Sequence, residues 1–262
     1  MTTNQVISLT TDFGEADGYV GTMRGVILNI CPQAILVNLS HQIPPQDIRA
    51  GAFVLYIAAP YFPPDAIHCI VVDPGVGSDR RAVAVRTPQG IFVAPDNGVL
   101  SLVLAEQPAE EVVCLTNPVY QLPLVSSTFH GRDIFAPAAA HLACGVPLSE
   151  FGPPAAGLVT FPVPRPAFEG DTLVAAHVMH IDRFGNLILD ATAADVGGSR
   201  PIFNIKAATI EGLQSTFADV DDGQFLAYVG SSRDHIEIAV RNGNAARQLQ
   251  ARVGDAVAVE YQ

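Results

Sequence analysis

An apolar run that ends in Asp-Pro is the sequence feature that most constrains how this chain can fold. The run covers residues 66–72 (AIHCIVV) and predicts a buried strand. The strand ends at Asp73, because the proline that follows cannot continue it. Two glycines then allow a tight turn that leads to Arg80. A carboxylate and a guanidinium thus lie on a Gly-rich loop at the carboxyl end of a strand, where ligands bind in open α/β sheets. The alternative is a surface turn with one solvated ion pair.

The rest of the first 150 residues alternates between strand and helix patterns. Asp17 is a candidate cap for the first helix, and Asn97 is a candidate cap for the helix that runs through residue 104. Strands alternating with helices predict an α/β domain with a mostly parallel central sheet flanked by helices. The predicted strands are 6–10, 34–39 and 66–72 and a hairpin of 82–86 with 90–93, and the predicted helices are 18–30, 46–56, 97–104 and 134–144.

A change of composition divides the chain near residue 151. Five prolines occur between residues 152 and 166, which favours a semi-rigid linker. Beyond residue 171 the pattern becomes a series of short β segments, typical of a small barrel or sandwich. We therefore predict an N-terminal α/β domain over 1–152, a Pro-rich linker over 153–170 and a C-terminal β-barrel domain over 171–262.

Charge and composition exclude several classes of partner. The net charge of −12 and the pI of about 4.8 disfavour nucleic acid, because phosphate binding needs a basic surface. No apolar run approaches the roughly 18–20 residues that span a bilayer, and the first residues lack the pattern of a signal peptide. The four cysteines are widely spaced and form no CxxC, which favours a reducing compartment. These features predict a cytoplasmic protein without a nucleic-acid or membrane partner.

Clustered polar groups occur in five predicted loops of an otherwise apolar sequence. None of these loops is a P-loop, a GxSxG elbow or an HExxH motif. A metal site is conceivable from Asp12, Asp73, Asp96 and His130, but the short-range spacing typical of metal ligands is missing. On spacing alone, His130 can equally be a structural histidine, and a helix cap is the less favoured alternative for Asp12. The five loops contain Asp12; Asp73 with Arg80; His130 with Arg132 and Asp133; residues 181–186; and residues 230–232.

Six motifs follow one another along the chain: TDFG, VVDPGVGSDRR, APDNG, STFHGRDIFAPAAAHLA, IDRFGN and IEIAVRNGNAA. In this order they resemble the S-adenosylmethionine (SAM) hydroxide adenosyltransferase family, and the resemblance covers the chain from residue 7 to the C-terminus. This family, also called the SAM hydrolases, is related to the SAM-dependent fluorinase and chlorinase. The resemblance implies an α/β domain followed by a β-barrel domain, and a homotrimer that binds SAM between the N-terminal domain of one subunit and the C-terminal domain of its neighbour.

The resemblance also implies roles for individual residues. Asp73, Arg80 and His130 match the catalytic set that positions and activates a water molecule. Asp12 matches the carboxylate that holds the ribose hydroxyls, and Phe129 lies near the sugar. The remaining substrate-binding candidates are Phe13; Asp182 and Asn186, for adenine and methionine; Ser231 or Ser232, for the methionine carboxylate; Glu237; and the backbone around Val240 and Asn242, for the adenine edge. Because the segment SSRDHIEIA is one residue longer than the family pattern, both Ser231 and Ser232 remain candidates.

The same comparison addresses the nucleophile. A fluorinase has a tyrosine where Asp73 stands, a halide-binding serine where Gly131 stands, and an insertion before the APDNG-like turn. A chlorinase-like site also lacks the Asp–Arg–His set. The resemblance therefore implies hydrolysis of SAM by water to adenosine and methionine, with the (R)-sulfonium epimer as a candidate substrate and without a metal or other cofactor. Three rivals stay open: a SAM- or adenosine-binding sensor with negligible turnover, a SAM-dependent halogenase and a metal-dependent hydrolase.

Overall fold

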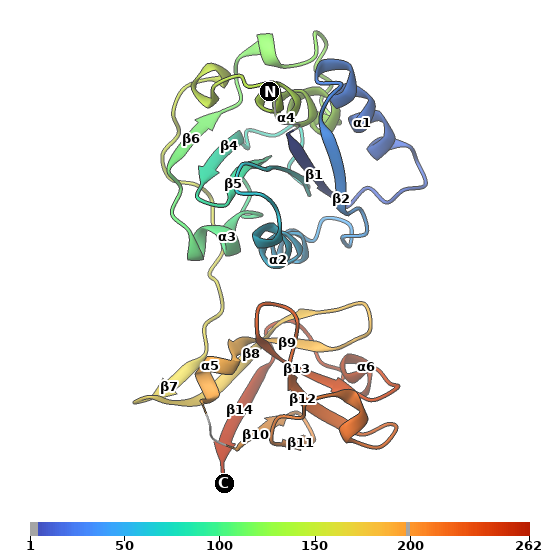
Figure 1. Ribbon diagram of the computed structural model, residues 1–262, viewed down its shortest axis with the longest axis vertical. Helices are drawn as coiled ribbons and strands as arrows, with labels where there is room; N and C mark the ends of the chain where they lie inside the picture. Colours follow the sequence, from blue (N-terminus) through green and yellow to red (C-terminus); the bar gives the residue numbers. More distant parts are fainter. Residues whose placement is uncertain (1–4, 198–199) are drawn as a thin grey trace. The chain divides into compact units, whose positions relative to one another are not determined.

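The computed structural model describes residues 5–197 and 200–262 and divides into two compact units, Met1–Val163 and Pro164–Gln262 (Figure 1). Each unit has a hydrophobic core of its own. The predicted α/β domain followed by an all-β, barrel-like domain is confirmed. In the part of the chain that is described, no helix has both the length and the apolar character needed to cross a bilayer.

A six-stranded mixed sheet organises the N-terminal unit. Its strand order is β2-β1-β3-β5-β4-β6, and the first three neighbouring pairs are parallel, whereas β4 is antiparallel to both β5 and β6. β3 is buried along its whole length, as its continuous apolar sequence predicts. The strands are β1 (Val6–Thr11), β2 (Ile35–Ser40), β3 (Ile67–Val71), β4 (Ala82–Thr87), β5 (Gly90–Pro95) and β6 (Glu111–Cys114).

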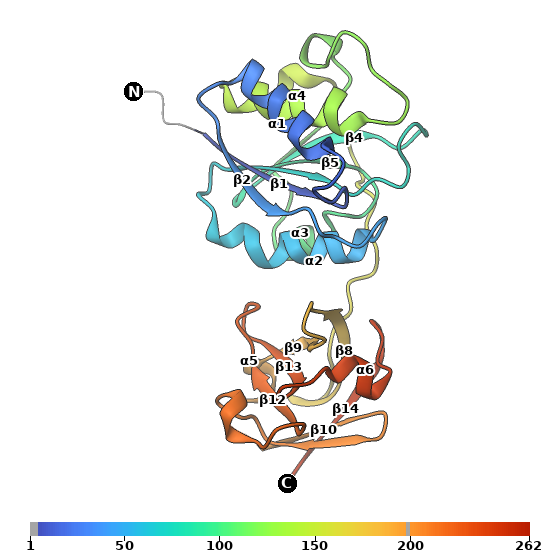
Figure 2. The ribbon, with the colours of Figure 1, turned by 90° about the vertical axis from the view of Figure 1, so that its right-hand side faces the viewer.

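Helices cover both faces of this sheet, and Figure 2 shows α1 and α4 on one face and α2 and α3 on the other. On the first face the core includes Met23 and Ile27 of α1, and on the second it includes Leu55 of α2 and Val103 of α3. The helices are α1 (Tyr19–Ile30), α2 (Ile48–Ala58), α3 (Ser101–Glu106) and α4 (Ala136–Ala143), with short 3-10 turns at Ala59–Tyr61, Pro118–Tyr120 and Leu148–Phe151.

Two predicted helix caps are wrong. The residue that caps α1 is Gly18, in a left-handed conformation, and no side chain caps that helix, so Asp17 does not have this role. Leu100 stands at the cap of α3, while the Asn97 side chain accepts a hydrogen bond from the Val99 amide inside the preceding turn. Asp and Asn favour such local turns as readily as caps, so their presence before a helix does not decide between the two.

The C-terminal unit is an eight-stranded antiparallel sheet with the order β11-β10-β14-β8-β9-β13-β12, and β7 pairs with β8. A bridge between Gln214 and Tyr228 joins the chain after β11 to β12, so the sheet is nearly closed. Each β segment expected beyond residue 171 corresponds to a strand, whereas the three-residue β7 and two short helices were not predicted. The elements are β7 (Ala167–Glu169), β8 (Thr172–Ile181), β9 (Leu187–Thr192), α5 (Ala193–Val196), β10 (Pro201–Ile205), β11 (Ala208–Glu211), a 3-10 turn (Phe217–Asp219), β12 (Phe225–Val229), β13 (His235–Val240), α6 (Ala245–Leu249) and β14 (Ala256–Tyr261).

Candidate active site

The carboxyl ends of two neighbouring strands bring the first two candidate carboxylates to one edge of the sheet. β1 and β3 are parallel, and their last residues, Thr11 and Val71, are paired in register. Asp12 directly follows β1, and Asp73 follows β3 with one residue, Val72, between them. This is the edge at which open α/β sheets bind ligands.

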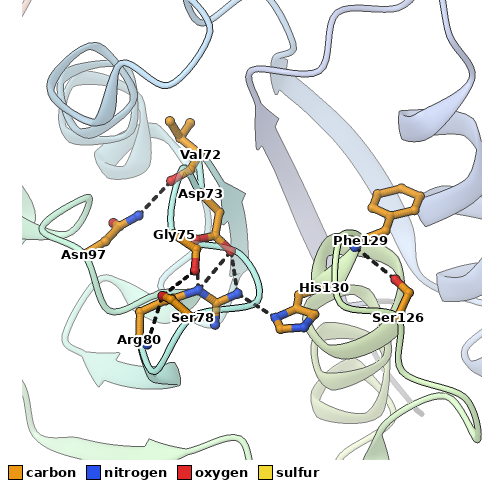
Figure 3. A network of polar contacts seen from close by, with 9 residues as sticks. All are labelled: Val72, Asp73, Gly75, Ser78, Arg80, Asn97, Ser126, Phe129 and His130. Atoms are coloured by element: carbon orange, nitrogen blue, oxygen red, sulfur yellow. Dashed lines mark hydrogen bonds and ion pairs between the residues drawn. The ribbon is translucent and has the colours of Figure 1, made fainter.

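The loop that follows Asp73 turns back so that Arg80 binds its carboxylate (Figure 3). Arg80 Nε lies 2.9 Å from Asp73 Oδ1, and Arg80 Nη2 lies 2.5 Å from Asp73 Oδ2. The side chain of Asp73 is 4% exposed and that of Arg80 10%, so this is not a solvated surface pair. Gly77 has φ +77, and a Cβ there would overlap the Ser127 carbonyl, so only glycine fits this approach of the two loops.

His130 completes the cluster from the opposite loop. Arg80 Nη2 lies 2.7 Å from His130 Nδ1. A guanidinium has donors and no acceptor, so Nδ1 accepts this bond and the proton of the neutral ring is on Nε2. Burial and the charge of Arg80 hold the pKa of His130 below its ordinary value, although Asp73 and Asp133 act in the opposite direction. His130 is therefore neutral at pH 7, as this bond requires.

A turn of π-helix, Gly131–Phe135, joins His130 to α4, with Pro137 in the first turn of that helix. Because Pro137 has no amide proton, it cannot bond to the carbonyl of Asp133 four residues earlier. The Leu122 amide donates to that carbonyl instead, at 2.9 Å. The irregular turn thus ties the 122–130 loop to the start of the helix.

Arg132 and Asp133, which the sequence placed with His130, form the anchor of this loop. Arg132 donates from Nε to Asp133 Oδ1 at 2.6 Å, and the Ser126 amide donates to Asp133 Oδ2 at 2.8 Å. Asp133 is fully buried. Burial alone would raise the pKa of Asp133, but the bonds from Arg132 and Ser126 outweigh that effect and lower it. We assign Asp133 a structural role, since its carboxylate is directed at its own loop.

Asp12 and an aromatic cluster lie along the same edge. The Gln46 amide donates to Asp12 Oδ2 at 2.7 Å. Phe13, Tyr19 and Phe129 form a mutual edge-to-face cluster with centroid separations of 5.3–6.0 Å. The structure therefore brings the predicted Phe13 and Phe129 together. It adds Tyr19, which the sequence analysis missed, since an aromatic residue at the start of a helix carries no signal of a site.

The other predicted residues belong to the C-terminal unit. There the Asp182 carboxylate organises the β8–β9 turn, accepting from the Phe184 and Asn186 amides at 2.9 and 2.8 Å and from Asn186 Nδ2 at 2.9 Å. An open cavity of about 590 Å³ is lined by Phe184 and Asn242, among others. Val240 is buried in the core, and its carbonyl accepts a hydrogen bond from the Gly243 amide at 3.1 Å.

Glu237 is a buried carboxylic group beside the β12–β13 turn. Tyr228 donates from its hydroxyl to Glu237 Oε2 at 2.5 Å, and the Ser232 side chain also hydrogen-bonds to Glu237. Burial raises the pKa of Glu237, and the nearby charge of Asp182 adds to the effect. Ser232 is thereby tied to the barrel, whereas its neighbour Ser231 is exposed at the turn.

Family models and individual relatives match this chain over most of its length. The model described as the SAM hydroxide adenosyltransferase N-terminal domain matches residues 7–152, and the corresponding C-terminal domain matches residues 176–258. An (R)-S-adenosyl-L-methionine hydrolase of Salinispora tropica is 41% identical over 97% of both chains, and one of Thermus thermophilus is 38% identical over 93% of this chain and 95% of its own. A fluorinase of Nocardia brasiliensis is 27% identical over 97% and 96%. The crystal structure of an uncharacterised conserved protein from Thermotoga maritima superposes with a TM-score of 0.89 at 33% identity, covering 97% of this chain and 99% of that one.

Proposed function

Because the chain belongs to the SAM hydroxide adenosyltransferase family, we propose that it hydrolyses SAM to adenosine and methionine. The observation that carries the proposal is the hydrogen-bonded cluster of Asp73, Arg80 and His130 at the carboxyl edge of the sheet, in which the Asp73 side chain is only 4% exposed. The names of the relatives from Salinispora tropica and Thermus thermophilus support the (R)-sulfonium epimer as the preferred substrate.

The reaction needs a positioned water molecule more than it needs an acid. Water attacks C5′ in line with the sulfonium, the C5′–S bond breaks, and its electron pair stays on sulfur, so methionine leaves as a neutral thioether. The attacking oxygen must lose a proton as adenosine forms, and this proton requires an acceptor.

Asp73 suits the role of proton acceptor better than His130 does. Both His130 ring nitrogens are committed in the neutral form, Nδ1 as acceptor from Arg80 and Nε2 as a donor. Among the residues that the structure describes, Asp73 Oδ1 accepts only the bond from Arg80 Nε and retains a lone pair. Asp73 then takes the proton, while the Nε2–H group of His130 can donate to the water oxygen and orient it.

The packing around Gly131 favours water over halide as the nucleophile. A Cβ at Gly131 would lie 3.3 Å from Met23 Sδ and at the same distance from Phe13 and Phe129 ring atoms. The serine that binds halide in a fluorinase would therefore force these side chains to move.

The proposal assigns substrate binding to both units. Asp12 holds the ribose hydroxyls, and Phe13 and Phe129 contact the sugar. We place the adenine and methionine contacts on the C-terminal unit of a neighbouring subunit in a homotrimer, and the enzyme in the cytoplasm, a reducing compartment that suits four free cysteines. No metal or other cofactor takes part. The C-terminal contacts come from Asp182, Asn186, Ser231 or Ser232, Glu237, Val240 and Asn242.

Product analysis tests the proposal directly. The purified protein is incubated with mixed SAM epimers, with and without chloride and with and without EDTA, and the products are separated by chromatography. We expect adenosine and methionine, independent of chloride and of EDTA, and residual SAM enriched in one epimer. A 5′-chloro product would identify a halogenase, loss of activity in EDTA would identify a metalloenzyme, and bound ligand without product would identify a sensor.

A matched pair of variants on one loop tests the role of Asp73. Asp73→Asn removes the proton acceptor and should lower kcat by about 100-fold or more. Asp79→Asn changes an exposed carboxylate in the same loop and should leave kcat within about twofold. Equal activities of the two variants would refute the assignment of Asp73.

A further inference from the structure

The APDNG motif, residues 94–98, covers the end of β5 and the turn that follows it, and it is bonded to both ends of the catalytic loop, residues 73–81. At one end, Asn97 Nδ2 donates to the carbonyl oxygen of Val72 at 2.9 Å (Figure 3). Val72 is fully buried and directly precedes Asp73. Asn97 Oδ1 accepts from the Val99 amide, so both ends of the Asn97 amide group are held.

At the other end of the loop, Asp96 binds Arg81, the residue after Arg80. Arg81 Nε lies 2.8 Å from Asp96 Oδ2, and the Asp96 amide donates to the Arg81 carbonyl at 2.9 Å. The side chain of Asp96 is 3% exposed. Two consecutive residues of one turn thus fix the positions that flank Asp73 and Arg80.

A third segment, the strap formed by residues 156–161, is bonded to the same pair. Arg81 donates to the carbonyls of Ala156 and Gly157, and the Val159 amide donates to Asp96 Oδ1 at 2.8 Å. Both carboxylate oxygens of Asp96 therefore have partners, which leaves Asp96 unsuited to act as a base or as a ligand for a metal.

We propose that Asp96 and Asn97 are positioning residues for the hydrolysis of SAM, because they set the separation and orientation of Asp73 and Arg80 from outside the site. The inference rests on the proposed function, because the exact placement of Asp73 and Arg80 matters only if these residues activate a water molecule. A misplacement of about 1 Å at a reacting group can cost roughly 100-fold in rate. The bonds at both ends of this nine-residue loop therefore serve turnover as well as folding.

Two near-isosteric substitutions test the inference. Asn97→Asp keeps the acceptor for the Val99 amide and places an oxygen against the Val72 carbonyl, and Asp96→Asn removes the charge that holds Arg81. In both variants kcat for SAM should fall by roughly 10- to 100-fold while KM stays within about twofold. Ser101→Ala is the matched control, because Ser101 Oγ donates to the Gly98 carbonyl of the same turn at 2.6 Å and accepts from the Phe161 amide of the strap at 3.0 Å, and neither bond reaches the catalytic loop. The Gly98 carbonyl keeps the Ser101 amide as a donor at 2.9 Å, so we expect the bonds of Asp96 and Asn97 to stay in place. The kcat of Ser101→Ala should be unchanged.

The pH dependence of kcat gives a readout that a loss of stability would not move. The pKa of His130 responds to Arg80, Asp73 and Asp133, which face it from the two loops. If Arg80 is displaced in Asn97→Asp, its charge no longer lowers the pKa of His130. The pKa then rises, and the acid limb of kcat moves to higher pH. The limb should stay in place in Ser101→Ala, with each variant assayed below its own Tm.

The outcomes separate this inference from the proposed function. If Asp73→Asn is inactive but Asn97→Asp and Asp96→Asn keep kcat and the acid limb of the wild type, the inference is overturned and the proposed function stands. A rise in KM alone also overturns it, because it would assign the turn to binding. Full activity of Asp73→Asn overturns both. Should Asn97→Asp fail to fold, Asp96→Asn alone decides.

Discussion

The hydrogen bond between Arg80 and His130 determines, at the scale of a single residue, which ring nitrogen is protonated. Arg80 can only donate, so His130 has to be neutral and to accept through Nδ1. Protonation of His130 would remove that acceptor and place a cation beside Arg80. Activity should therefore fall with acid as His130 titrates, at a pH below the ordinary histidine value of about 6.5.

An NMR titration checks this prediction without relying on turnover. The Cε1–H signal of His130 is assigned by its loss in His130→Gln, and its midpoint should lie below about 6.5. In Arg80→Gln the cation is removed while Asp73 and Asp133 still favour the charged ring, so the midpoint should rise above the wild-type value. An unchanged midpoint in Arg80→Gln would mean that burial alone lowers the pKa of His130.

The pairing of Asp73 with Arg80 could be predicted from the sequence, whereas the bond between Asn97 and the backbone of residue 72 could not. Asp73 and Arg80 are seven residues apart across a Gly-rich turn, and that pattern was readable. Asn97 bonds to the Val72 carbonyl, and any residue could supply that carbonyl, so the pairing leaves no trace in sequence. The motif containing Asn97 was recognised, but its role required coordinates.

At the scale of secondary structure, the π-turn before α4 positions His130. Its cause is local, since Pro137 lacks an amide proton and the buried Asp133 carboxylate is paired with Arg132. A helix was correctly expected here, but the extra residue in the turn has no compositional signature. The long apolar strand β3 was the easiest element to predict, because burial on both faces requires a continuous apolar sequence.

Asp133→Asn should destabilise this element. The Asn side chain has one oxygen and one NH2 group, whereas Asp133 accepts from both Arg132 and the Ser126 amide. The NH2 group would therefore face one of these two donors at a fully buried position. The expected cost is about 2–4 kcal/mol in the free energy of unfolding at pH 7, measured by chemical denaturation. Glu111→Gln is the control, because Arg86 and Glu111 form an exposed pair and its loss should cost under about 0.5 kcal/mol.

The sign of the pH dependence follows from the lowered pKa of Asp133. A carboxylate with a folded-state pKa below its unfolded value stabilises fully above about pH 3.9, and this stabilisation is lost as pH falls through the folded-state pKa. The difference in stability between wild type and Asp133→Asn should therefore shrink below pH 4. A difference that stays constant into acid would contradict the ionised pair.

At the scale of the whole molecule, the candidate residues divide between two units. Asp12, Asp73, Arg80 and His130 belong to the N-terminal unit, and the predicted adenine and methionine contacts belong to the C-terminal unit. The order of six motifs along the chain allowed both sets to be predicted. The sequence does not show whether the two sets of one site come from the same chain or from neighbouring chains, because the motifs and their order are the same in both cases.

Mixing two inactive variants distinguishes a site shared between subunits from a site within one chain. Asp73→Asn disables the N-terminal set and Asn186→Ala the C-terminal set, and each should be inactive alone although folded, as its Tm would show. If the proposed trimer forms and its sites are shared between neighbours, a site in a mixed trimer combines two unaltered units about one time in four. Coexpression should then restore roughly a quarter of wild-type activity. Differently tagged chains recovered together would prove that mixed oligomers form. Mixed oligomers without activity would place the complete site within a single chain, because every chain then carries one disabled set.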